Sequence, residues 1–102
     1  MAEGFDFEQK QKEDARWRIL RVIDAGRPIA VSEQIVWRVL VDLKLLFSLH
    51  DVRRELDYLR MRKLIEIEGE ETDFWYGTLT RAGIDLVEYT APVEPGIARP
   101  RR

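Results

Sequence analysis

The segment that most constrains the fold is SLHDVRRELDYLRMRKLIEIE, residues 48–68, because one hydrophobic repeat gives way to another within it. Its first part places apolar residues such as Leu56 and Leu59 three or four positions apart, which is typical of one face of a helix. Its last part alternates Ile65 and Ile67 with glutamates, which is typical of a strand with one buried face. The sequence therefore predicts a helix that runs, after a short link, into a strand.

Capping residues predict where this helix and the last one begin. Ser48 and Asp51 form an S-x-x-D capping box, so the predicted helix begins at Leu49, and it ends near residues 62–63. After the strand, GEETD is typical of a loop, and FWYGTL is predicted to return as the second strand of a β-hairpin. Thr80 then caps a predicted closing helix, RAGIDLVEY.

Two further helices are predicted before this segment. The first covers residues 8–25, and Gly26 and Pro28 end it, because glycine takes the C-cap conformation and proline cannot continue a helix. The second covers residues 33–46, after a capping Ser32. The predicted core positions are Trp17, Leu20 and Ile23 in the first helix and Ile35, Val36, Val39, Leu40, Leu43 and Leu46 in the second.

The composition favours one folded domain without disulfides. Of 102 residues, 45% are hydrophobic and 35% charged, and none is cysteine, which excludes thiolate metal sites. No apolar run is long enough for a membrane span and the first residues lack a signal pattern, so we expect a cytoplasmic protein with no membrane partner. We expect a flexible arm over residues 1–7, a domain over residues 8–91 and a Pro/Arg-rich tail over residues 92–102.

The order of these elements, three helices, a hairpin and a closing helix, is that of a winged-helix domain. The junction KLIEIE…WYGTLTRAG resembles one that is frequent in this superfamily, where an L-T-x-x-G signature opens the helix after the hairpin. Leu79, Thr80 and Gly83 match that signature. The resemblance implies an α+β, mostly α, fold: a winged helix-turn-helix with a three-helix core, a β-hairpin wing and a C-terminal helix. Such a fold leaves the function open.

A narrower resemblance involves four segments of the chain. EDARWRILRVI, SLHDVRRELDYLRMRKLIEIE, WYGTLTRAGIDLV and the basic ending PGIARPRR together look like a family of short winged-helix-like proteins encoded in Mu-like prophages. Members are similar to transcriptional regulators in fold. The resemblance implies a phage-encoded protein that acts in a bacterial host cell, and it assigns no mechanism.

In winged helices that bind DNA, the third helix enters the major groove. Transferred by position, this resemblance nominates His50, Arg53, Arg54 and Tyr58 as contacts to duplex DNA, with Arg99, Arg101 and Arg102 of the tail as further contacts. Arg54 has the chemistry to grip guanine through two hydrogen bonds. Asp51 and Asp57 stand three residues to either side of Arg54, however, and could pair with it on the helix surface for at most about 0.5 kcal/mol each. Both interpretations stay open.

The predicted hairpin carries only negative charge. Its five carboxylates would repel a phosphate backbone and oppose the counterion release on which DNA affinity depends. The alternative is a non-catalytic protein–protein interaction module in phage assembly or regulation, whose hairpin contacts a phage or host protein. The carboxylates are Glu66, Glu68, Glu70, Glu71 and Asp73.

A second apolar row, Trp37, Val41 and Leu45, is predicted nearly opposite the core face of the second helix. In one interpretation, the chain covers the row itself, with Phe5 and Phe7 of the arm or with the tail. In the other, the row is the interface of a symmetric homodimer, for which a tryptophan among aliphatic residues is well suited. Both stay open.

The residues give little support to catalysis. His50 is the only histidine, and the chain has neither a Gly-rich phosphate loop nor a G-x-S-x-G nucleophile turn. The spacing of the hairpin carboxylates matches no calcium-binding loop. We therefore expect a protein that is not an enzyme and that uses no metal or cofactor.

Overall fold

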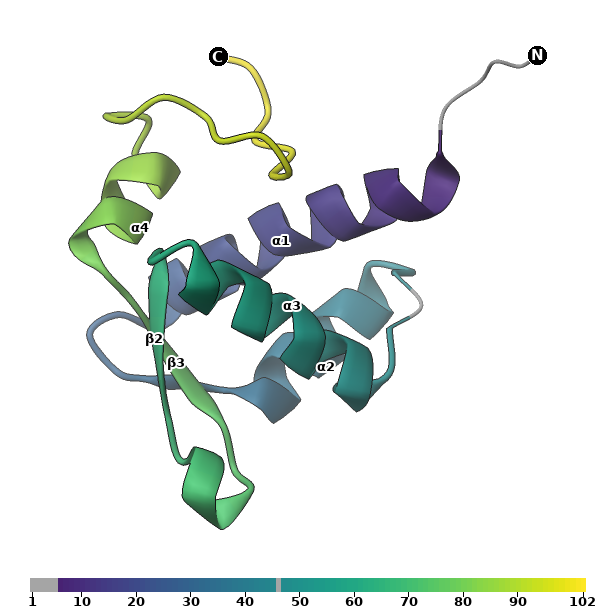
Figure 1. The fold of residues 1–102 in the computed structure, drawn as a ribbon, viewed down its shortest axis with the longest axis vertical. Helices are drawn as coiled ribbons and strands as arrows, with labels where there is room; N and C mark the ends of the chain where they lie inside the picture. The colour runs from purple at the N-terminus through teal and green to yellow at the C-terminus, as the bar shows by residue number, and fades with distance from the viewer. Residues whose placement is uncertain (1–5, 46) are drawn as a thin grey trace.

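The structure is a computed structural model that describes residues 6–45 and 47–102, and its elements follow the predicted order (Figure 1). A 3-10 turn over Glu70–Thr72 forms the tip of the hairpin. The prediction of an α+β, mostly helical chain is confirmed, while the predicted positions Phe5 and Leu46 lie outside the described residues. The helices are α1 (Phe7–Gly26), α2 (Glu33–Asp42), α3 (Leu49–Met61) and α4 (Arg81–Val87), and the strands are β1 (Val31–Ser32), β2 (Ile65–Glu68) and β3 (Tyr76–Leu79).

Side-chain caps mark the starts of the helices, which lie at the predicted residues or one residue away. The Ser48 amide donates to Asp51 Oδ2 at 2.9 Å and the Asp51 amide donates to Ser48 Oγ at 3.1 Å, so the predicted capping box is confirmed. The hydroxyls of Ser32 and Thr80 cap α2 and α4 as predicted. Asp6 caps α1, which therefore begins one residue before the predicted range.

The hairpin belongs to a three-stranded antiparallel sheet with the order β1-β3-β2. Val31 of β1 and Ile67 of β2 both stand opposite Gly77 on the central strand. A Cβ on Gly77 would lie 3.1 Å from Ile23 Cδ1, so the glycine lets α1 approach the sheet closely. The strand β1 was not predicted, because two residues are too few to show an alternating pattern.

The helix α2 is shorter than predicted and presents a different face to the core. It ends at Asp42, and Lys44 has a left-handed φ of 65°. Glu33 is buried at the first turn, and this places Val36 and Leu40, three and seven residues later, inside. Two of the predicted core positions are therefore wrong: Ile35 is 50% exposed and Leu43 is 43% exposed.

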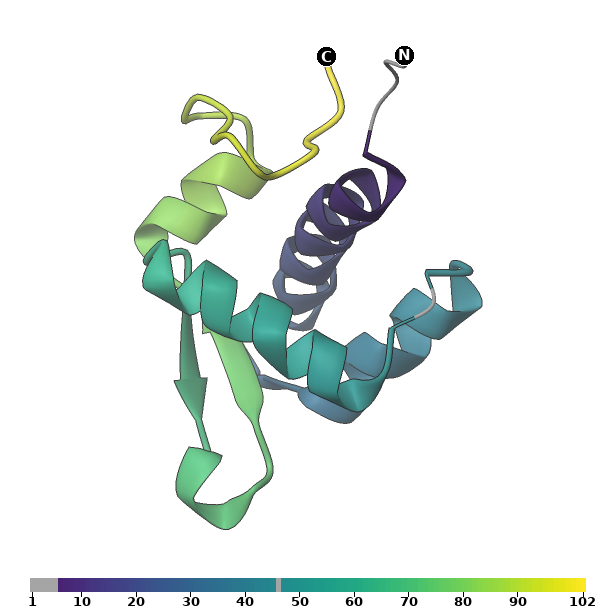
Figure 2. The same cartoon turned by 45° about the vertical axis from the view of Figure 1, so that its right-hand side comes forward.

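The core lies where α1 meets α2, α3, α4 and the sheet, and α1 contributes its centre (Figure 2). The predicted core residues Trp17, Leu20 and Ile23 of α1 and Leu56 and Leu59 of α3 are buried there, whereas Leu49 at the start of α3 is half-buried. Burial of an aliphatic side chain of this size stabilises the folded state by about 1.5–3 kcal/mol. The largest fully buried apolar residues are Ile19, Leu20, Ile23, Val36, Leu40, Val52, Leu59, Leu64, Ile65 and Leu86.

One ion pair is buried within this core. Arg16 Nε of α1 donates to Glu55 Oε1 of α3 at 2.7 Å, and Arg16 Nη1 donates to the Gly96 carbonyl at 3.0 Å. The same guanidinium lies 3.7 Å from the centre of the Tyr58 ring. Arg16 therefore connects two helices and the C-terminal segment at one point.

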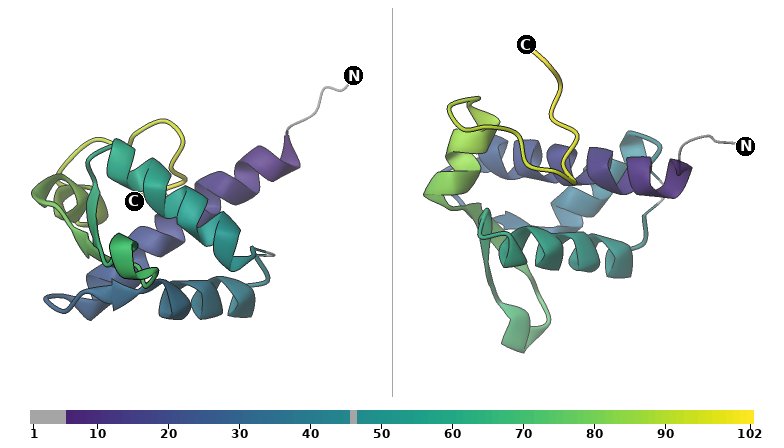
Figure 3. Two further views of the ribbon diagram at one scale, coloured as in Figure 1. Left: turned by 60° about the horizontal axis from the view of Figure 1, so that its bottom comes forward. Right: turned by 45° about the horizontal axis from the view of Figure 1, so that its top comes forward.

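The predicted tail packs against the rest of the chain. Ile97 is buried, and the Ala98 amide donates to the Glu13 carbonyl of α1 at 3.1 Å. Arg99 Nη1 donates to the carbonyls of Leu86 and Ala91 at 2.9 and 2.8 Å. Figure 3 shows the segment passing from α4 back along α1. The tail is therefore attached to its own domain.

The buried ion pair predicts a large effect of removing one partner. We expect Glu55→Ala to lower the free energy of unfolding by roughly 3–5 kcal/mol, because Arg16 would remain charged and buried without its carboxylate. Urea unfolding followed by circular dichroism measures this. The control is Arg54→Ala, one residue away on the exposed face, with an expected change within about 0.5 kcal/mol. Equal effects of the two variants would contradict the prediction.

Candidate interface on helix α3 and the hairpin

Arg53 lies between α3, α2 and the hairpin, and carboxylates from α2 and from the hairpin both contact it. Its guanidinium donates two hydrogen bonds to Glu33, at 2.6 and 2.8 Å. It also donates to Asp73 Oδ1 at 2.6 Å and to the Asp73 carbonyl at 2.9 Å. These donors are used inside the molecule, and a contact of Arg53 with DNA stays a prediction.

Glu33 is positioned by the backbone of β3 as well as by Arg53. Its Oε2 accepts from the Trp75 amide at 3.1 Å, and its own amide donates to the Trp75 carbonyl at 2.9 Å. The hydrogen bonds from Arg53 hold the pKa of the Glu33 carboxyl below its usual range, although burial opposes this. In turn, Glu33 and Asp73 raise the pKa of Arg53. We call Glu33, Arg53 and Asp73 the hairpin bracket.

His50 and Arg54 are exposed on α3, as predicted. Arg54 Nη2 lies 3.2 Å from Asp51 Oδ1, and Arg54 Nε lies 3.7 Å from Glu55 Oε2. Pairing with Asp51 is thus confirmed. The other predicted partner, Asp57, instead pairs with Arg60, which also contacts Glu70 at 2.5 Å.

Tyr58 was predicted to point outward with Arg54, and this is wrong. The ring is half-buried between Arg16 and the returning C-terminal segment. A Cβ on Gly96 would lie only 2.4 Å from the Tyr58 hydroxyl oxygen, so the segment passes directly over this ring. The sequence did not show this because the covering residue is 38 positions away.

The tail arginines do not extend the α3 surface toward the hairpin. Arg99 and Arg102 lie 4.3 and 4.1 Å from the Tyr89 ring centre, and only Arg101 has no such contact among the described residues. In Figure 1 the C-terminus and the hairpin tip lie at opposite ends of the molecule. A contact of these three arginines with DNA stays a prediction.

Three hairpin carboxylates keep their charge unmatched. Glu66 and Glu68 lie on β2 and Glu71 lies in the tip, and all three are exposed. In the described part of the chain none of them has an ion-pair partner, whereas Glu70 and Asp73 pair with arginines of α3. The outer face of the hairpin is consequently an acidic surface, which we define as Glu66, Glu68 and Glu71.

The predicted apolar row on α2 does not exist as one exposed surface. Because α2 ends at Asp42, Leu45 leaves the helix and is buried in the core. Trp37 is half-buried and its indole N–H donates to the Phe47 carbonyl at 2.8 Å. Val41 alone of the three is exposed. The row is therefore covered largely by its own chain, and a homodimer stays a prediction.

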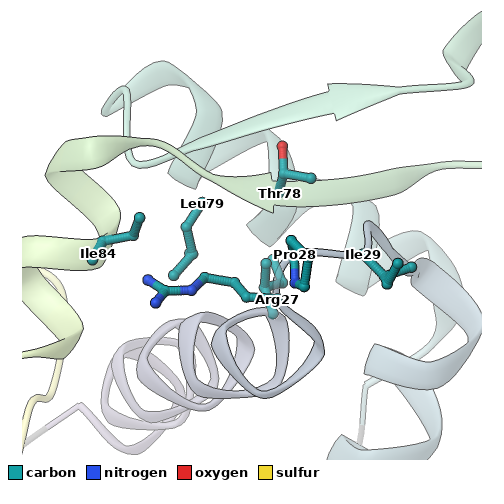
Figure 4. Close-up of a pocket in the computed structure, with 7 residues that line it drawn as sticks. Arg27, Pro28, Ile29, Thr78, Leu79 and Ile84 are labelled. Atoms are coloured by element: carbon teal, nitrogen blue, oxygen red, sulfur yellow. The ribbon is translucent and has the colours of Figure 1, made fainter.

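One surface cavity lies away from α3, at the end of α1 (Figure 4). It measures about 440 Å³, and its walls are mostly aliphatic. Of its lining residues only Arg27 is titratable, and Figure 4 shows its side chain extending toward Leu79 and Ile84. The Arg27 guanidinium lies 3.6 Å from Asp24 and 3.9 Å from Glu88. No acid–base pair for catalysis lines this cavity.

Sequence reasoning missed Glu33, Trp75 and the hairpin bracket. The only local signal was a glutamate in the first turn of a helix, which usually complements the helix dipole at the surface. Its burial depends on β1 bringing the start of α2 beside β3. No local sequence pattern indicates that contact, because it forms only when distant segments of the chain come together in the fold.

Comparisons of the chain with protein-family models, with curated proteins and with solved structures found no significant match. Among the described residues, no helix has the length and apolar character needed to cross a membrane.

The hairpin bracket predicts a pH-dependent stability. Since the folded state holds the pKa of Glu33 below its ordinary value of 4.5, this carboxylate stabilises the fold above that pH. The contribution is lost as the pH falls through the lowered pKa. We expect Glu33→Gln to lower the unfolding free energy by roughly 1–3 kcal/mol at neutral pH, with a smaller difference from wild type in strong acid.

Urea unfolding at pH 7 and at pH 3 measures both differences. Glu68→Gln is the matched control, because Glu68 is exposed and unpaired among the described residues, and it should leave stability nearly unchanged. If Glu33→Gln lowers the unfolding free energy by the same amount at both pH values, the predicted pH dependence is wrong.

Proposed function

We propose that this chain is a winged-helix-like, non-catalytic interaction module whose acidic surface binds a basic region of a partner protein. The observation that carries the proposal is an asymmetry of charge. All four arginines of α3 and its C-cap, at positions 53, 54, 60 and 62, pair with carboxylates, while the acidic surface has no described partner. Among the described residues, the unpaired charge of the hairpin is therefore negative, and Lys63 beside it is an unpaired cation.

The arrangement of elements supports the winged-helix part of the proposal. Three helices precede a hairpin, and the hairpin is followed by α4, whose cap is the threonine of the L-T-x-x-G signature. The third helix lies beside the hairpin, as the superfamily resemblance implies. The prophage resemblance further favours a phage or host protein as the partner.

Electrostatics disfavour DNA as the main partner. To reach a phosphate, Arg53 would have to leave Glu33, and a buried carboxylate would lose its counter-charge. Any duplex close to the hairpin would also meet the acidic surface, which opposes the release of counterions. A basic protein segment meets neither obstacle.

DNA binding remains the second candidate, and one observation favours it. His50 and Arg54 are exposed on the first two turns of α3, where the C-terminal segment does not cover them. The contact of Arg54 with Asp51 lies at the surface and can exchange for a guanine or phosphate. In this proposal α3 would act as the reader and the hairpin would stay clear of the duplex.

One titration series separates the two candidates. We expect a fluorescein-labelled oligolysine peptide to bind the protein at about 50 mM salt, and a labelled random-sequence duplex of similar size not to bind. Fluorescence anisotropy measures both. Peptide affinity should fall about tenfold or more in Glu66→Gln/Glu68→Gln, because two of the three attracting charges are removed.

The matched control is Glu8→Gln/Asp42→Asn, which removes the same charge from exposed positions on α1 and α2. It should leave the peptide affinity nearly unchanged. If both double variants weaken the peptide equally, binding follows net charge alone and the proposal fails. Duplex binding that Arg54→Ala abolishes would establish the second candidate instead.

A further inference from the structure

The strand β2 is an edge of the sheet, and the alternation of the ladder shows which of its backbone groups are free. The Thr80 amide donates to the Leu64 carbonyl at 3.0 Å, and these residues are opposite each other in the register of β2 with β3. Hydrogen-bonded and non-hydrogen-bonded pairs alternate in an antiparallel ladder. Glu66 and Glu68 therefore bond to β3, and the N–H and C=O groups of Ile65 and Ile67 point away from it.

The free groups open onto a groove along this edge. It measures about 600 Å³, and Arg60 and Lys63 from the end of α3 form its other wall. Glu66, Ile67 and Glu68 line it and are exposed or half-buried, whereas Ile65 is only 1% exposed, so the edge is accessible from Glu66 onward. An extended segment laid in the groove would have the free N–H and C=O of Ile67 as its backbone partners.

The side chains of β2 determine which extended segments can bind in this groove. Glu66 and Glu68 point to the outer face, and Ile67 points to the inner face. In a second copy added in any register that matches the faces, glutamate would stand opposite glutamate, and like charges directly opposite each other destabilise a pair. The same charges protect the edge from self-association and attract lysine or arginine.

We infer that β2 accepts an extended segment of a partner protein as a fourth strand, with basic residues at every second position. This inference rests on the proposed function and specifies how the partner is held. The basic side chains lie opposite Glu66 and Glu68, in the non-hydrogen-bonded pairs of the new ladder, where side chains approach most closely. The residue between them bonds to the backbone of Ile67, since Ile65 is buried.

The inner face of the added strand is apolar. Its side chains would lie over half-buried Ile67 and beside the aliphatic part of Lys63. Asp57 and Glu70 already neutralise Arg60, so of the two cations in this wall only Lys63 lacks an ion-pair partner among the described residues, against the two unpaired glutamates of β2. The partner segment therefore alternates basic with β-branched residues over about four to six positions, the length of β2 and its ends.

The probe is a labelled peptide of four Lys-Val repeats, and the comparison is a peptide of the same composition with its lysines grouped at one end. Both have the same charge, and only the first can place every lysine on one face of a strand. We expect the alternating peptide to bind about tenfold more tightly in fluorescence anisotropy titrations.

Backbone methylation tests the hydrogen bonds directly. N-methylation of the valines removes the donors that face β2, and we expect it to weaken binding at least tenfold. N-methylation of the same number of lysines removes donors that face away, and it should leave the affinity within about threefold. On the protein, Ile67→Pro deletes an edge N–H that makes no ladder bond, whereas Ile67→Val retains it.

We expect Ile67→Pro to remain folded and to lose the preference for the alternating peptide, with Ile67→Val as its control. Equal binding of the alternating and grouped peptides, or equal effects of the two methylation patterns, would overturn strand addition while leaving the acidic surface as a binding site. If neither peptide binds, the proposed function and this inference both fail.

Discussion

The hydrogen bonds from Arg53 to Glu33 are the interaction on which the arrangement of α2, α3 and the hairpin depends. Glu33 accepts from the guanidinium and from the Trp75 amide, so one buried carboxylate joins three elements. Asp73 adds a contact from the hairpin tip. A charge-assisted network of this kind orients the hairpin against α3, and it also withdraws Arg53 from any external ligand.

This use of arginine explains how a helix with the composition of a DNA reader can belong to an acidic protein. Each guanidinium on α3 meets a carboxylate from its own helix, from α2, from the hairpin or from the C-terminal segment. Net charge alone, at −2, does not reveal this pairing. The outer face of the hairpin keeps three carboxylates without an ion-pair partner among the described residues, and under the proposed function this charge attracts a basic partner.

The C-terminal segment has a comparable structural role on the other side of the molecule. Its backbone satisfies Arg16 and covers Tyr58, and Ile97 completes the core beside α1. The arginines of this basic ending therefore make different contacts. Arg99 bonds to backbone carbonyls and Arg102 stacks over Tyr89. A segment rich in proline and arginine can thus pack as part of a domain when its few apolar and backbone groups have partners.

The sequence by itself determined the elements whose causes are local. Repeats of three to four and of two residues predicted the helices and the hairpin, and Ser32, Ser48 and Thr80 marked the helix starts, because a cap and its free amides are neighbours in the chain. Tertiary structure alone decided which face of α2 is buried, where Leu45 and Tyr58 lie and which carboxylate each arginine meets. Those outcomes depend on groups 20 to 80 residues apart, such as Arg53 with Glu33 and Arg16 with Gly96, and no local repeat encodes such contacts.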